Sequence, residues 1–211
     1  MNAGPRHHCL IYEGSPALQL PSVAAVMIEK LKSNVRCLYL NSPTMVAGLR
    51  SYVAAGGVNV MSEVKRGSLI LTSDQDHLND GQFDVERMLR MLLDELGRAR
   101  RDGYAGLWAV GDMMWEFGSE KNLEKLLEYE CGLEELLQQE TGIGGICQYH
   151  QDILPASAIQ AALYTHQSVY LNETLSRLNP FYIQPEALRH DGQAANRVEQ
   201  MLGTLRGPLT Q

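Results

Sequence analysis

Three residues of the sequence are of types that bind soft or borderline metal ions: His7, Cys9 and Cys147. His7 and Cys9 are two positions apart in a short apolar run, and residues two apart on a β-strand point to the same face of the sheet. Cys147 lies in another apolar run and shares a face with Tyr149 in the same way. A thiolate–imidazole cluster could bind zinc, another soft metal or haem. The alternative is that the cysteines are small buried hydrophobic residues.

A glycine turn follows the first apolar run, in the position that a phosphate-binding loop would occupy between a strand and a helix. A Walker A motif starting at Gly14 requires glycine, lysine and a hydroxyl residue at positions 19, 20 and 21, but the sequence has Gln19, Leu20 and Pro21. The residues that hold the phosphates and magnesium are therefore missing, and Pro21 has no backbone N–H. We expect no ATP as a cofactor. The Gly-x-Ser-x-Gly elbow of many hydrolases is also missing, so we expect no enzymatic activity.

The segment from Gly111 to Trp115 is the densest group of unusual residues in the sequence. Met113 and Trp115 could form an adaptable wall for an apolar ligand, because methionine adapts to varied shapes. The alternative is that they close the hydrophobic core, and Asp112 could bind a ligand or cap the following turn. The predicted ligand-binding residues are therefore His7, Cys9, Gly14, Asp112, Met113, Trp115, Cys147 and Tyr149.

Short apolar runs alternate with longer helical patterns, and these predict the elements that position the candidate residues. Strands are expected at residues 8–12, 37–40, 58–60, 68–72, 104–110, 145–149, 168–171 and 180–183. Helices are expected after Pro21 and Pro43 and at residues 85–101, 123–139, 155–164 and 185–205. This alternation implies an α/β three-layer sandwich with a mostly parallel central sheet. Ligands of such sheets bind beyond the carboxyl ends of the strands, where Gly14, Asp112 and Trp115 fall.

The bulk composition is that of an ordinary globular protein, with 211 residues of which 45% are hydrophobic and 20% charged. The net charge of −7 argues against a nucleic-acid surface, which normally carries a basic patch. The four cysteines form no CxxC pair and are expected to be thiols. Because we find neither a signal peptide nor an apolar run long enough to span a bilayer, we expect a cytoplasmic protein that contacts no membrane.

Several short blocks of the sequence resemble, in order, the MEDS domain, the methanogen/methylotroph DcmR-type sensory domain. Residues 7–13 match its opening of His-x-Cys, apolar residues, tyrosine and an acidic residue. The later blocks are residues 36–39, 81–84, 103–104, 111–115, 129–130, 146–149, 166 and 179–182. His7, Cys9, Asp112, Trp115 and Cys147 fall on the distinctive positions of the family. The resemblance covers about residues 6–185 and implies a fold similar to the RecA and KaiC ATPases, without a functional phosphate loop.

The resemblance also implies a sensory role in prokaryotic signalling or transcriptional regulation, with small hydrocarbon-like molecules as ligands. We expect the sensory domain at residues 5–185 and a C-terminal helix and tail at residues 186–211. No helix-turn-helix or kinase segment is recognisable, so the expected output is a signalling partner, such as a kinase or regulator, or homo-oligomerisation. Two alternatives stay open: a degenerate RecA/KaiC-like nucleotide-binding protein, and a ligand-independent adaptor of a kinase or sigma-factor pathway.

Overall fold

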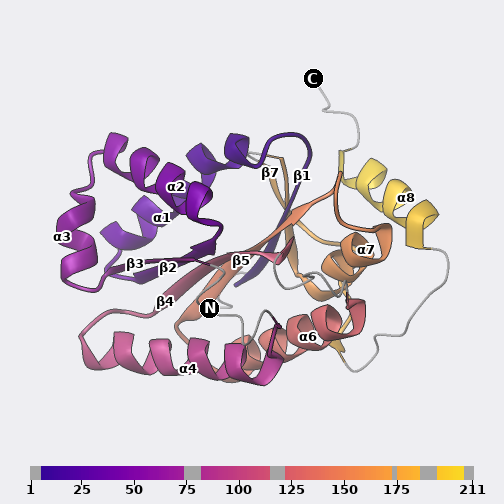
Figure 1. Ribbon diagram of the computed structural model, residues 1–211. Coiled ribbons are helices and arrows are strands. Elements are labelled where there is room, and N and C mark those ends of the chain that lie inside the picture. The colour runs from indigo at the N-terminus through magenta and orange to yellow at the C-terminus, as the bar shows by residue number, and fades with distance from the viewer. Residues whose placement is uncertain (1–5, 74–81, 115–121, 173–174, 186–193, 207–211) are drawn as a thin grey trace.

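A seven-stranded sheet forms the centre of the protein, in a computed structural model that describes residues 6–73, 82–114, 122–172, 175–185 and 194–206 (Figure 1). The strands are β1 (His7–Tyr12), β2 (Arg36–Asn41), β3 (Leu69–Ser73), β4 (Leu107–Asp112), β5 (Ile143–His150), β6 (Ser168–Leu171) and β7 (Leu175–Leu178). Their order in the sheet is β3-β2-β4-β5-β1-β6-β7. All neighbouring strands are parallel except β6 and β7, which are antiparallel. The predicted, mostly parallel central sheet is confirmed.

Helices cover both faces of the sheet and complete three layers (Figure 1). One face carries α1 (Leu20–Lys32), α2 (Pro43–Ala55) and α3 (Val60–Lys65), with the short 3-10 helix η1 (Pro16–Gln19) before α1. The opposite face carries α4 (Val85–Arg101), α6 (Leu123–Gln139), α7 (Ala156–Thr165) and α8 (Ala194–Arg206). Each face has its own hydrophobic core: Leu10 and Tyr12 of β1 belong to the α1 side, and Cys9 and Ile11 to the α6 side. The alternation along β1 follows from the two-residue period of a strand.

Helix α6 carries acidic residues on the stripe that faces the sheet. Asn122 caps its N-terminus, where the side-chain oxygen accepts hydrogen bonds from the backbone N–H groups of Glu124 and Lys125 at 3.1 and 3.2 Å. Its buried leucines follow helical spacing, but Glu130 and Glu134 lie on the same buried face, with exposed fractions of 0% and 1%. Since buried carboxylates are costly unless they are paired, this face marks a specific polar site.

Two predicted strands are wrong, and an asparagine explains each. Residues 58–60 form no strand, because the side chain of Asn59 accepts a hydrogen bond from the Ser62 N–H at 3.1 Å and begins helix α3. Residues 180–183 form a turn, in which the Asn179 side chain accepts from the Phe181 N–H at 3.0 Å and donates to the His166 carbonyl at 2.7 Å. The strand that pairs with β6 is the preceding segment, β7.

The last helix packs against α7 and the core beneath it (Figure 1). Its buried residues Val198, Met201, Leu202 and Leu205 belong to the same hydrophobic cluster as the α6 side of the sheet. Arg206, at the end of α8, forms an ion pair with Glu13 at 2.6 Å. Helix α8 is therefore part of the packed structure, and the predicted boundary at residue 185 stays a prediction. Among the described helices, none has the length and apolar character needed to cross a bilayer.

Candidate functional site

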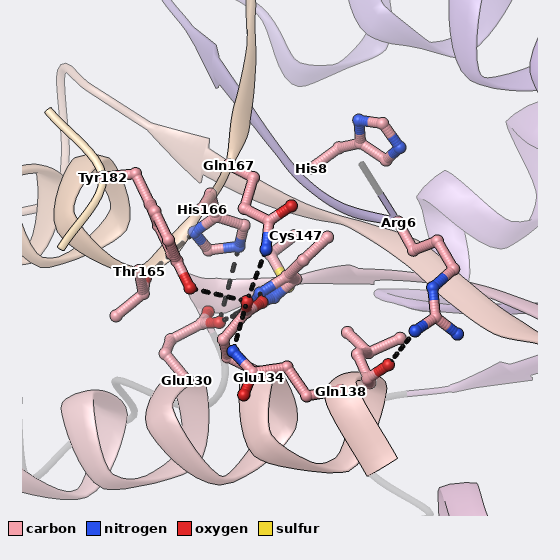
Figure 2. Close-up of polar contacts among 12 residues, drawn as sticks. Arg6, His8, Glu130, Glu134, Gln138, Cys147, Thr165, His166, Gln167 and Tyr182 are labelled. Atoms are coloured by element: carbon pink, nitrogen blue, oxygen red, sulfur yellow. Dashed lines mark hydrogen bonds and ion pairs between the residues drawn. The ribbon is translucent and has the colours of Figure 1, made fainter. Parts of the chain in front are cut away.

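Four buried side chains meet on the α6 side of the sheet: His7 at the start of β1, Glu130 on α6, Cys147 on β5 and His166 just before β6. We call these four residues the buried cluster. One nitrogen, oxygen or sulfur atom from each lies within 4.8 Å of those from the others. Figure 2 shows Glu130 rising from α6 toward Cys147 and His166, which lie above the helix. The donor types are two imidazoles, a carboxylate and a thiol.

The parallel pairing of β1 with β5 brings the first part of the cluster together. His7 lies opposite Gly145 and Cys9 lies opposite Cys147 in the register of the two strands. Gly145 has no side chain, so the imidazole of His7 and the thiol of Cys147 meet on the same face. The Sγ atom of Cys147 is 3.7 Å from His7 Nε2 and 3.8 Å from a carboxylate oxygen of Glu130.

Glu130 lies at the centre of the buried cluster. Its Oε2 atom is 3.2 Å from His7 Nε2 and 3.5 Å from His166 Nε2. Its other oxygen accepts a hydrogen bond from the Tyr149 hydroxyl. The imidazole of His166 is fixed from behind, where Nδ1 lies 2.8 Å from the carbonyl oxygen of Ala162. The rings of His7 and His166 are in contact, with centroids 3.8 Å apart.

A second carboxylate, Glu134, lies one helical turn beyond Glu130 and holds the other side of His7. Its Oε2 atom is 2.9 Å from His7 Nδ1. Its Oε1 atom accepts hydrogen bonds from Tyr182 at 2.7 Å, Gln167 at 2.8 Å and Gln138 at 3.1 Å, as Figure 2 shows. Residues from α6, β1 and the segments on either side of β6 and β7 therefore converge on one carboxylate.

The pKa values of the cluster follow from burial and from these contacts. Burial alone would lower the pKa of His7, but its hydrogen bonds to Glu130 and Glu134 raise it to about 9. Burial and the charge of His7 lower the pKa of His166 to about 3. Although burial opposes ionisation, His166 and His7 keep the pKa of Glu130 below its usual value, and hydrogen bonds from His7 lower that of Glu134 to about 2. Such strongly perturbed, mutually coupled groups are typical of functional sites.

An apolar cavity of about 40 Å³ adjoins the buried cluster, between the sheet and helices α4 and α6. His7 and Cys147 line one part of it. The rest is almost wholly apolar and includes Leu38, Leu40, Met88, Leu92, Met113 and Leu133. The cavity is therefore a small hydrophobic space with an imidazole and a thiol in its wall.

Some of the predicted site residues do come together here. His7 and Cys9 share a face of β1, and Cys147 and Tyr149 share a face of β5, as the strand pattern predicts. Cys9 packs in the core beside Cys147, where burial raises the pKa of its thiol, but it is not one of the four residues of the buried cluster. Met113 lines the cavity. Trp115 lies outside the described residues.

Gly14 and Asp112 lie elsewhere, at the carboxyl edge of the sheet. His7 is the first residue of β1, whereas Gly14 comes two residues after its end and Asp112 is the last residue of β4. Asp112 accepts hydrogen bonds from the Met114 N–H at 2.8 Å and the Tyr12 hydroxyl at 3.2 Å, and burial raises its pKa. The predicted ligand-binding residues are thus divided between the interior of one face and this edge.

The Gly14 turn has the left-handed backbone conformation that glycine favours, with φ of 76°. Its backbone N–H donates to the carboxylate of Asp152 at 2.7 Å. A phosphate would have to displace this carboxylate, and its negative charge would be repelled by it. This contact and the missing lysine both oppose phosphate binding at the turn.

Reasoning from the sequence missed Glu130, Glu134 and His166 as members of the site. Glu130 and His166 occur in the blocks of the family resemblance, but neither was among the predicted ligand-binding residues. The available signal was position within α6: Glu130 and Glu134 share the buried stripe with Leu126, Leu133 and Leu137. An acidic pair on the apolar stripe of a helix indicates buried partners.

The chain resembles a KaiC-like protein of the hyperthermophilic archaeon Pyrococcus horikoshii, with a TM-score of 0.52 and 15% identity over 79% of this chain and 71% of that one. The fold of the chain is therefore RecA/KaiC-like, as predicted from the sequence. The model of the MEDS family, described as the methanogen/methylotroph DcmR sensory domain, matches residues 6–167. The chain belongs to this family and carries a sensory domain. No curated protein matches the chain.

Proposed function

We propose that this protein senses a small, mostly apolar molecule, which binds in the cavity bordered by His7 and Cys147. The observation that supports this most strongly is the cavity itself, an apolar space that adjoins a buried polar cluster in a member of a sensory family. Cavities of this kind discriminate by size and shape, while a few polar groups fix the orientation of the ligand.

The cavity volume limits the size of the ligand. About 10–15 Å³ is enough for one water molecule, and drug-sized ligands occupy roughly 300–1,000 Å³. A cavity of about 40 Å³ therefore suits a molecule of a few non-hydrogen atoms. Met88 and Met113 in the wall can adjust to slightly different shapes. Haem, which the sequence left open, is far larger than this space, and we do not propose it.

Helix α6 is the element through which binding would be transmitted. It carries Glu130 and Glu134 of the polar site, and its residues Leu133 and Leu137 line the cavity. A ligand that favours one position of α6 would shift the population of two states, provided that it binds them with different affinity. We propose that the protein has no catalytic role and signals to a kinase or regulator, or through its own oligomerisation. The nucleotide-binding alternative has less support, because the Gly14 N–H already donates a hydrogen bond to the carboxylate of Asp152.

Thermal unfolding of the full chain with and without small apolar probes tests this proposal. Xenon and short-chain alcohols should raise the Tm, because a ligand that binds only the folded state stabilises it, by about 2.7 kcal/mol at 100 times its Kd. Ala109 lines the cavity, so Ala109→Val should reduce the shift. Ala24→Val, a matched change in the core of the opposite face, should preserve it. Equal shifts in the wild type and Ala109→Val, or no shift with any probe, would contradict the proposal.

A further inference from the structure

We propose that the buried cluster is a metal site, in which His7, Glu130, Cys147 and His166 bind one divalent transition-metal ion of the zinc class. The donor atoms are Nε2 of each histidine, Oε2 of Glu130 and Sγ of Cys147. They come from four separate segments of the chain, and all four side chains are buried. Four protein donors are the usual number for a zinc site that has no open position.

Four of the six separations between the donor atoms are close to the edges of a tetrahedron around zinc, and all six are within 4.8 Å. Zinc bonds of about 2.0–2.3 Å give nitrogen–oxygen edges of about 3.3 Å and edges to sulfur of about 3.6 Å. In the structure, Glu130 Oε2 is 3.2 Å from His7 Nε2 and 3.5 Å from His166 Nε2. Cys147 Sγ is 3.7 Å from His7 Nε2 and 3.8 Å from Glu130 Oε2. An ion could therefore bind with small movements of the side chains.

The surrounding hydrogen bonds already orient the donors. A histidine that binds a metal usually donates its other ring N–H to a carboxylate or a backbone carbonyl, which fixes the tautomer and the ring plane. Nδ1 of His7 lies 2.9 Å from Glu134 and Nδ1 of His166 lies 2.8 Å from the Ala162 carbonyl. These contacts fix the tautomer and the plane of each imidazole ring, so that Nε2 points into the cluster. The second oxygen of Glu130 is held by Tyr149.

One buried nitrogen atom of the cluster makes no hydrogen bond within the described residues, and a bound metal ion would give it a partner. Nε2 of His166 has no hydrogen-bond partner within the described part of the chain, although the residue is fully buried. Such an atom normally costs free energy, because it has lost its contact with water. Since the atom faces Glu130 at 3.5 Å, a metal ion between them would satisfy both.

The donor set selects the class of metal. Magnesium and calcium prefer sites built from oxygen atoms, whereas imidazole and thiolate suit zinc and related ions. Cobalt(II) binds similar sites and can serve as a coloured probe. This inference goes beyond the proposed sensory function and does not depend on it. A chain that binds zinc but no apolar probe would support the metal site alone, and the converse result would support the sensory cavity alone.

Cobalt binding to the full chain tests the proposal directly. Because the cluster is buried, the protein is first unfolded in the presence of a chelator to remove any metal. The chelator is then removed, and the protein is refolded and titrated with Co²⁺. We expect one equivalent to bind, with the visible absorption of tetrahedral cobalt and a near-ultraviolet thiolate-to-cobalt band. Zn²⁺ should displace the cobalt. A wild-type chain that folds but shows neither band nor tight binding would overturn the proposal.

Cysteine variants identify the sulfur donor. Cys147→Ser should abolish the thiolate band and weaken binding at least tenfold, whereas Cys9→Ser, a matched change at the neighbouring buried thiol, should leave both unchanged. A band that survives in Cys147→Ser and disappears in Cys9→Ser would contradict the assignment. If Cys147→Ser does not fold, X-ray absorption of the zinc-loaded wild type decides: we expect one sulfur and three nitrogen or oxygen neighbours, and a shell without sulfur would refute the site.

Discussion

Nδ1 of His7 lies 2.9 Å from the carboxylate of Glu134, across the interface between the sheet and helix α6 and 127 positions along the chain. The other nitrogen of the same ring lies 3.2 Å from Glu130. One imidazole therefore connects the first strand to two consecutive turns of α6. Because both carboxylates are buried, we expect the position of this helix to depend on the protonation of His7.

Removing the charge of Glu134 should destabilise the protein. Glu134→Gln keeps one acceptor oxygen, but its NH2 group must face either His7 or the donors of Tyr182 and Gln167, so we expect a loss of about 1–3 kcal/mol in the free energy of unfolding. Urea denaturation measures the change. Glu135→Gln, at the exposed neighbouring position, should change it by less than about 0.5 kcal/mol. Equal effects of the two substitutions would show that the network around Glu134 contributes no stability.

Removing the charge of Asp112, at the carboxyl edge of the sheet, should not destabilise the protein at neutral pH. Burial raises the pKa of Asp112, so the folded state disfavours its ionised form, and stability falls as the pH rises from the unfolded pKa through the folded one. We expect Asp112→Asn to be as stable as the wild type or more stable at neutral pH, with a smaller advantage in mild acid. Denaturation at both pH values measures this.

The matched change Asp112→Ala leaves the Met114 N–H and the Tyr12 hydroxyl without their acceptor. It should therefore cost about 1–3 kcal/mol at either pH. If Asn destabilised the protein as much as Ala at neutral pH, the carboxylate would be favourable in its ionised form, and the interpretation of Asp112 would be wrong.

A methyl group at Gly145 should disrupt the sheet next to His7. A Cβ atom there would overlap the carbonyl oxygen of Ala109 on the neighbouring strand, and backbone atoms cannot easily move away. We expect Gly145→Ala to lower the free energy of unfolding by about 1–3 kcal/mol, as overpacking does in tight sites. Gly203→Ala, in α8 with open space around it, should be neutral or stabilising by up to about 1 kcal/mol. A Gly145→Ala chain of unchanged stability would contradict the close strand pairing.

The four thiols should differ in their accessibility to alkylating reagents. Cys9, Cys37 and Cys147 are buried, whereas Cys131 on α6 is partly exposed. Burial raises the pKa of Cys37 to about 12, which further suppresses its thiolate. Brief treatment of the native chain with iodoacetamide should label Cys131 first, and denaturation should make all four reactive; peptide mass spectrometry distinguishes them. Rapid labelling of Cys147 in the native state would contradict the burial of the cluster.

The sequence predicted the parts of the fold that have strong periodicity. The bounds of α4 and α6 match the predicted ranges because their apolar residues recur at helical spacing over 17 residues each. The strand predictions at residues 58–60 and 180–183 were wrong because short apolar or aromatic runs also occur at helix starts and turns. In these two places Asn59 and Asn179 determine the conformation. Strand alternation correctly predicted that His7 shares a face with Cys9, and Cys147 with Tyr149. The partners of His7 on α6 depend on packing between segments more than 100 residues apart, which no local pattern encodes.

Crystals grown with zinc and measured at its absorption edge would test most directly whether the buried cluster is the binding centre of this domain. We expect one anomalous peak inside the protein, about 2.0–2.3 Å from the donor atoms of His7, Glu130, Cys147 and His166. An empty cluster with the peak at the carboxyl edge, beside Gly14 or Asp112, would contradict it.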